Sequence, residues 1–213
     1  ILLSISSFLL REWKSLYDIF AKIFSFATRD RTIGEYENRD YVVNLQLLDS
    51  EGYLANYYKR QDATFLQDNV TVFEDFMYGK GDFSSHYNCS PGKKIDIIPD
   101  GHRNKILIYF KNPKNKGDED SIHIQTIIRN GFTESEEWIE LEIRRRTRHV
   151  ELEVEFPPER HCISAAIQER RRNRTTTLGG EHFTVLPNGC QVVRWEKKER
   201  IEPLEVITFK WQW

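Results

Sequence analysis

The sequence predicts an all-β fold, an antiparallel β-sandwich of about eight to ten strands, preceded by one amphipathic helix. Short segments with alternating apolar and polar residues recur from about position 35 to the C-terminus, and turn residues separate them. Of the 213 residues, 13% are aromatic and 30% are charged, so the aromatic side chains must be segregated inward. A partly closed barrel is the alternative to two packed sheets. We therefore expect a helix over residues 1–30 and one β-sandwich domain over residues 35–213.

The N-terminal segment carries apolar residues at intervals of three and four, as one face of a helix requires. This stripe comprises Leu2, Ile5, Leu9, Trp13, Leu16, Phe20 and Ile23. Arg11 and Glu12 interrupt the run, so it is too short to span a membrane. We expect the helix to connect domains, to self-associate or bind a protein partner, or to pack on the β domain. Because the chain starts at Ile1, we expect membrane contact only if a further segment lies upstream.

The first half of the β region contains one hairpin and several separate strands. Residues 41–48 alternate in polarity, and Asp49-Ser50-Glu51-Gly52 then turns the chain into a second strand over 53–59. Further strands are expected over 70–78, 106–110 and 122–128. The polar stretch 79–103 is a long loop that includes a short strand over 95–98.

The second half alternates apolar residues with glutamates. Segments 138–143 and 150–156 have this pattern, and we expect them to be antiparallel neighbours joined across 144–148. Segments 183–186 and 191–195 flank Pro187-Asn188-Gly189, which predicts a hairpin with an Asn-Gly turn. The last strand, 204–213, places Phe209, Trp211 and Trp213 on one aromatic face that should close the core or an interface.

Charge and cysteine content limit the possible partners. The formal net charge is −2, so no overall field attracts nucleic acid or an anionic membrane. Cys89, Cys162 and Cys190 are odd in number and far apart, which is typical of a reducing compartment. We therefore expect a cytoplasmic protein, which would be close to a membrane only if an upstream segment anchors it.

Two groups of residues are candidates for a metal site or a catalytic site. His86, Cys89 and His102 have ligand-like spacing within the long loop, but the paired motif of a zinc site is missing, so no metal and no cofactor are expected. Cys162 beside His161 suggests a thiol hydrolase, yet Cys162 heads an apolar run typical of a buried cysteine. Phosphate loops, dinucleotide fingerprints and nucleophile elbows are absent from the sequence, so no catalytic residue is expected and we do not expect an enzyme.

Two arginine-rich runs are dense enough to bind phosphate groups. Their members are Arg144, Arg146, Arg148, Arg170, Arg171, Arg172 and Arg174. Many glutamates alternate along the neighbouring predicted strands, so the arginines could instead balance charge within the domain. Nucleotide or nucleic-acid binding through these loops is the alternative function.

The last third of the chain resembles a group of known modules. The stretch 151–160 (ELEVEFPPER), the Asn-Gly hairpin and the terminal FKWQW resemble the C-terminal end of uncharacterised β-rich modules in bacterial regulatory and defence-type multidomain proteins. The resemblance implies a regulatory or sensor module attached to an effector, with no catalytic residues to carry over. The expected function is therefore that of a non-catalytic sensing or protein-interaction module within a larger regulatory protein. We expect the N-terminal helix to connect this module to the rest of the protein or to mediate oligomerisation.

Overall fold

The computed structural model describes residues 34–79, 81–82, 86–100 and 103–213, of which the part from Glu35 to Trp213 is one compact unit. This unit is almost entirely β, as predicted. The predicted helix over 1–30, with its apolar stripe, lies outside the described residues. Within the described residues, no helix is both long enough and apolar enough to cross a membrane.

Fourteen strands and one short 3-10 turn make up the described part of the chain. The elements are β1 (Tyr36–Leu47), β2 (Leu54–Phe65), β3 (Val70–Tyr78), β4 (Asn88–Ser90), β5 (Lys93–Asp100), β6 (Arg103–Lys114), β7 (Glu119–Arg129), β8 (Glu136–Ile143), β9 (Thr147–Phe156), β10 (Ser164–Glu169), β11 (Arg174–Thr177), η1 (Gly180–His182), β12 (Phe183–Val185), β13 (Gln191–Lys197) and β14 (Glu205–Gln212). The expected eight to ten strands were too few because the sequence did not predict β4, β10 and β11, which are short.

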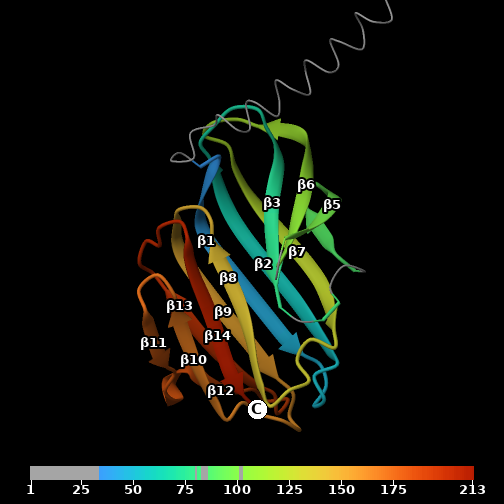
Figure 1. Cartoon of the computed structure of the whole chain (residues 1–213), viewed down its shortest axis with the longest axis vertical. Helices are drawn as coiled ribbons and strands as arrows, with labels where there is room; N and C mark the ends of the chain where they lie inside the picture. The colour runs from blue at the N-terminus through green and yellow to red at the C-terminus, as the bar shows by residue number, and fades with distance from the viewer. Residues whose placement is uncertain (1–33, 80, 83–85, 101–102) are drawn as a thin grey trace, which may run out of the picture. The chain divides into compact units, whose positions relative to one another are not determined.

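The strands form two layers (Figure 1). One layer is a seven-stranded sheet with the order β12-β13-β9-β1-β2-β7-β4. The other layer holds two smaller sheets side by side, one of four strands (β11-β10-β14-β8) and one of three (β3-β6-β5). Each sheet is open at both edges, so the described residues form a sandwich and not a closed barrel. β1 and β9 are parallel, whereas the other paired strands are antiparallel.

The structure confirms the two predicted hairpins and corrects one predicted pairing. β1 pairs with β2, and β12 pairs with β13 across the Asn-Gly turn. β5 is the strand expected within the long polar stretch. β8 and β9, however, are not neighbours: β8 pairs with β14, and β9 pairs with β1 and β13. The connection between them crosses from one layer to the other, so the apolar faces of both strands reach the core from opposite sides.

The core has two aromatic halves. Beneath the three-stranded sheet, the ring of Tyr36 stacks on Phe73 with 4.9 Å between ring centroids. Beneath the four-stranded sheet, Phe156 meets Trp211 and Trp213 edge-on, at 5.9 and 6.0 Å. The buried face of β14 is therefore the aromatic face that the sequence predicts. Between these halves the two smaller sheets meet, and the residues at their junction are polar.

Candidate functional site in a groove at the sandwich edge

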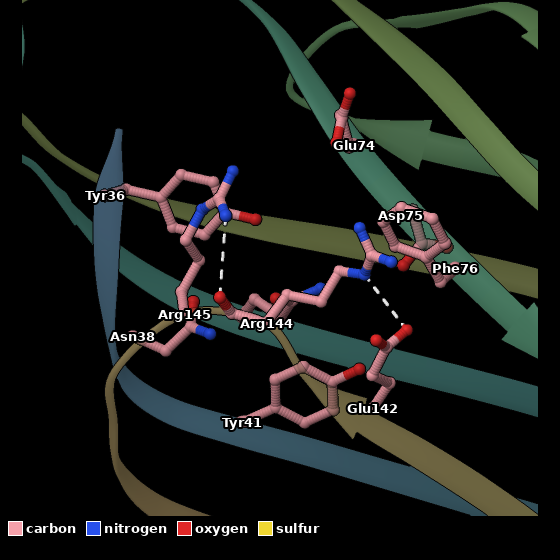
Figure 2. Close-up of a pocket in the computed structure, with 10 residues that line it drawn as sticks. Tyr36, Asn38, Tyr41, Glu74, Asp75, Phe76, Glu142, Arg144 and Arg145 are labelled. Atoms are coloured by element: carbon pink, nitrogen blue, oxygen red, sulfur yellow. Dashed lines mark hydrogen bonds and ion pairs between the residues drawn. The ribbon is translucent and has the colours of Figure 1, made fainter. Parts of the chain in front are cut away.

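A polar seam lies between the two smaller sheets, and a cleft opens there. Figure 2 shows the cleft, whose lining residues are Tyr36, Asn38, Tyr41, Gln61, Glu74, Asp75, Phe76, Glu142, Arg144 and Arg145. Its volume of about 20 Å³ has room for roughly one water molecule. The seam therefore offers no space for a larger ligand.

An ion pair that is inaccessible to solvent lies beneath the seam. The side chains of Lys59 and Asp75 are 0% and 1% exposed and form a salt bridge between β2 and β3. Tyr87 donates a hydrogen bond to Asp75 Oδ2 at 2.9 Å, and Lys59 donates to the carbonyl of Phe76 at 3.1 Å. Burial alone would lower the pKa of Lys59, but the Asp75 carboxylate raises it well above its ordinary value. Lys59 is thus a permanent cation that joins two sheets, and neither a base nor a nucleophile.

Arg144 is held within the seam. Its guanidinium lies over the ring of Phe76, 3.8 Å from the centroid, and its Nε is 3.0 Å from Glu142 Oε2. Arg103 donates to the same carboxylate oxygen at 2.7 Å, and the Tyr78 hydroxyl also bonds to it. Partial burial raises the pKa of Glu142, but the bonds from Tyr78 and Arg144 outweigh it and leave this pKa below its ordinary value. Arg144 therefore neutralises a carboxylate within the domain.

The other predicted arginines also have partners, most of them carboxylates. The ion pairs are Arg146 with Glu202 (3.8 Å), Arg148 with Glu37 (2.6 Å), Arg170 with Glu140 (2.9 Å) and Arg172 with Glu199 (3.3 Å). Glu199 and Glu202 lie in the connection between β13 and β14, so this one connection contacts both arginine runs. Of the seven arginines, only Arg171 and Arg174 have side chains that bond to no carboxylate in the described part of the chain: the Arg171 side chain donates to the Pro203 carbonyl, and the Arg174 side chain to the Thr176 hydroxyl. The backbone N–H of Arg171 donates to Glu205 Oε1 at 2.9 Å.

Arg174 lines a larger groove, which we call the edge groove. Its volume is about 240 Å³, and its lining residues are Glu169, Arg174, Thr176, Trp195, Glu196, Lys197, Lys198 and Glu199. They come from β10 and β11 of the four-stranded sheet, from β13 of the seven-stranded sheet and from the residues after β13. The edge groove therefore lies where the two layers of the sandwich open at one side.

The edge groove combines an aromatic surface with balanced charge. Trp195 is partly buried and packs against the hydrophobic core. Lys197 and Glu169 form an ion pair whose side chains are only 9% and 5% exposed. Of the lining residues, Arg174 and Lys198 add positive charge, while Glu196 and Glu199 add negative charge. Such a lining favours a ligand that carries both apolar and charged groups over a polyanion.

Two strands beside the edge groove have edges that pair with no further strand in the described structure, although the Arg194 carbonyl on β13 bonds to the His182 ring at 2.8 Å. β11 is the outermost strand of the four-stranded sheet. β12 pairs with β13 only from Gln191 to Val193, so the section of β13 that contains Trp195 extends beyond its partner. Uncovered strand edges present backbone donors and acceptors to which another chain can bond.

The structure describes only part of the predicted metal site and all of the predicted thiol site. His86 is exposed, Cys89 is half-buried in β4, and His102 lies outside the described residues. Burial raises the pKa of Cys162 to about 12, so its thiol stays protonated, and the thiol donates to the Ser164 carbonyl at 3.3 Å. His161 Nε2 bonds to the carbonyl of Gly189 at 2.9 Å. These two side chains thus have separate partners, with no bond between them to activate the thiol.

Sequence reasoning missed Trp195 as a site residue. The available signal was an aromatic residue followed by the charged run Glu196-Lys197-Lys198-Glu199 in one arm of a predicted hairpin. That pattern alone does not distinguish a groove from an ordinary strand end, because the groove also needs β10 and β11.

Comparisons with known proteins identify distant structural neighbours only. No protein-family model matches the sequence, and no curated protein matches it. An M1 zinc metallopeptidase from Deinococcus radiodurans, bound to a Tyr-Ser-Ala substrate, is 10% identical with a TM-score of 0.48, over 82% of this chain and 42% of that chain. A two-domain M1 zinc metallopeptidase bound to L-tryptophan is 9% identical with a TM-score of 0.49, over 83% of this chain and 43% of that one. The chain thus spans less than half the length of these neighbours.

Proposed function

We propose that this domain is a non-catalytic protein-interaction module that binds an extended peptide segment of a partner protein in the edge groove. The observation that supports the proposal is the position of Trp195, partly buried along a groove of about 240 Å³ and beside uncovered strand edges. Within a larger regulatory protein, such a module would act as the sensing part. The three cysteines are free thiols, which supports a cytoplasmic location for it.

The groove matches a peptide in size and in chemistry. A volume of about 240 Å³ accommodates one or two side chains, and Trp195 offers a flat apolar surface to an aromatic or aliphatic residue. Arg174 and Glu199 also line the groove and can pair with opposite charges on the peptide. The open edges of β11 and β13 supply the backbone hydrogen bonds of an added strand.

A nucleotide or single-stranded nucleic acid is the second candidate ligand. It is favoured by the side chains of Arg171 and Arg174, which bond to no carboxylate in the described structure, and by Trp195, on which a base could stack. Three glutamates among the eight lining residues disfavour a polyanion, because each opposes a phosphate group. The peptide is therefore the ligand that the groove supports better.

The test begins with selection of displayed peptides on the full chain, followed by fluorescence anisotropy with one enriched, labelled peptide. We expect micromolar affinity for peptides that carry an apolar residue between charged ones. Thr176→Arg fills the groove from a half-buried strand position, and Trp195→Ala removes its aromatic surface. Each should weaken binding by at least about tenfold, which corresponds to roughly 1.4 kcal/mol.

Lys111→Glu is the matched control, because Lys111 is an exposed strand residue on β6, in the three-stranded sheet. Its binding should equal that of the unchanged protein. Failure to enrich any peptide, or equal loss of binding in Lys111→Glu, would contradict the proposal. Saturable binding of a single-stranded oligonucleotide that disappears in Arg174→Ala and between about 0.05 and 0.3 M salt would instead support the second candidate.

A further inference from the structure

A cluster of potential metal ligands lies on the outer face of the seven-stranded sheet, the face away from the core. His149, Glu151 and Glu196 each offer one ligand atom, and these atoms lie within 4.8 Å of one another. His149 and Glu151 are two positions apart on β9 and so point to the same side, while Glu196 of β13 is the cross-strand partner of Glu151. In the described part of the chain this is the one group of three such residues. We infer that it binds a divalent transition-metal ion of the Zn²⁺ class.

The imidazole of His149 is held by a carboxylate in the way that is usual for histidine ligands of metal ions. Its Nδ1 is 2.8 Å from Oδ1 of Asp40, which is its neighbour on the parallel strand β1. This bond places a proton on Nδ1, so that in the neutral ring Nε2 presents a lone pair. A carboxylate that bonds to the far nitrogen of a histidine ligand in this way fixes the ring and makes it a stronger donor.

The other nitrogen of His149 has no hydrogen-bond partner, although it is inaccessible to solvent. Nε2 faces Oε2 of Glu196 at 3.6 Å. An acceptor that is buried without a partner is unfavourable by about 1–3 kcal/mol. A metal ion between Nε2 and the carboxylates would satisfy it.

Each carboxylate keeps one oxygen available for the ion. Glu196 bonds to Lys198 through Oε1 (3.0 Å), which leaves Oε2 facing His149. Glu151 bonds to Arg194 through Oε2 (2.7 Å), which leaves Oε1. Ligands about 2.1 Å from a tetrahedral ion are about 3.4 Å apart, close to the spacing of His149 and Glu196. Side-chain rotations that bring the three atoms from within 4.8 Å to about 3.4 Å of one another would complete the set, and a fourth position stays open to solvent because Glu196 is exposed.

The donor set selects among metals. One imidazole nitrogen with two carboxylates suits Zn²⁺, Co²⁺ or Ni²⁺, whereas Ca²⁺ and Mg²⁺ require mainly oxygen ligands in larger number. Arg194 and Lys198 reduce the net negative charge of the cluster, so we expect micromolar and not nanomolar affinity.

The experiment is isothermal titration of the full chain with ZnCl₂ under reducing conditions, together with the visible absorption spectrum after addition of Co²⁺. We expect one equivalent to bind. His149→Ala and Glu196→Gln should weaken binding by at least tenfold, and Asp40→Asn should weaken it by about 10- to 100-fold through the orientation of the ring. The Co²⁺ spectrum should show four-coordinate d–d bands without thiolate charge transfer, which excludes the cysteines as ligands.

His123→Ala is the matched control, since His123 lies on the same sheet face and bonds to the Tyr58 hydroxyl at 2.7 Å. Its Zn²⁺ binding should be unchanged. The inference fails if the unchanged protein binds no stoichiometric Zn²⁺, or if His149→Ala binds it equally well. Glu196 also lines the edge groove, but His149 does not, so the effect of His149→Ala on Zn²⁺ binding separates this inference from the peptide-binding proposal.

Discussion

Lys59 is a fully buried cation whose charge is balanced by one carboxylate. Its Nζ bonds to Asp75 and also lies 5.9 and 5.8 Å from the ring centroids of Tyr41 and Tyr57. Burial raises the pKa of Tyr41 far above its ordinary value, so that this phenol stays neutral beside the ion pair. The pair therefore joins β2 to β3 as a structural contact, and stability, not activity, is the property that should depend on it.

We expect Lys59→Met to lower the free energy of unfolding by about 3–5 kcal/mol, because it leaves the Asp75 carboxylate buried without a cation. Asp75→Asn should have an effect of similar size. The double variant should be clearly less destabilised than the sum of the two single variants. Urea unfolding followed by circular dichroism measures all three, and strict additivity would show that the two charges do not interact.

At the scale of elements, the turn between β1 and β2 packs against the residues that follow β7. Gly52 has a φ of +71°, and a Cβ at this position would lie 1.8 Å from the carbonyl oxygen of Phe132. Phe132 N donates to Gly52 O at 3.2 Å. Both the backbone conformation and this close approach therefore require glycine.

Gly52→Ala should lower the free energy of unfolding by about 2–4 kcal/mol, since the new methyl group must displace backbone atoms. Gly117→Ala is the control: Gly117 also has a positive φ, of +91°, but a Cβ there meets nothing within 4 Å. Gly117→Ala should lower the free energy of unfolding by only about 1 kcal/mol, because the left-handed backbone conformation is its only cost. Urea denaturation of both variants gives the comparison, and equal losses would mean that the contact with Phe132 is unimportant.

At the scale of the whole molecule, the two smaller sheets share one seven-stranded sheet. Neither could bury its apolar face without it, and the Lys59–Asp75 pair and the ring contact of Arg144 lie where they meet. The compact unit should therefore unfold as a single cooperative unit.

Native-state hydrogen exchange can test this cooperativity. We expect the most protected amides of β6, in the three-stranded sheet, and of β14, in the four-stranded sheet, to exchange with the same free energy, equal to that of global unfolding. A lower value for β6 alone would show that the three-stranded half opens separately.

The sequence by itself determined the all-β class, the hairpins β1–β2 and β12–β13, and the inward face of β14, because side-chain alternation and turn chemistry are local properties. Cys162 was likewise identified as buried from the apolar run that it heads. Only the tertiary structure decided which strands pair. The residues between β8 and β9 suggest a hairpin, yet the two strands belong to different layers, because each finds a better partner far along the chain.

The candidate sites depended on the tertiary structure even more strongly. Arginine runs that suggest phosphate binding are mostly neutralised by glutamates distant in sequence, as Arg148 is by Glu37. Trp195 becomes part of a groove only where β11 faces it, and His149 becomes a potential ligand only between Asp40 and Glu196. The physical reason is the same for each site. Charge pairing and metal coordination depend on distances of a few ångströms, and in this sandwich those distances are set by strands that are far apart in the sequence.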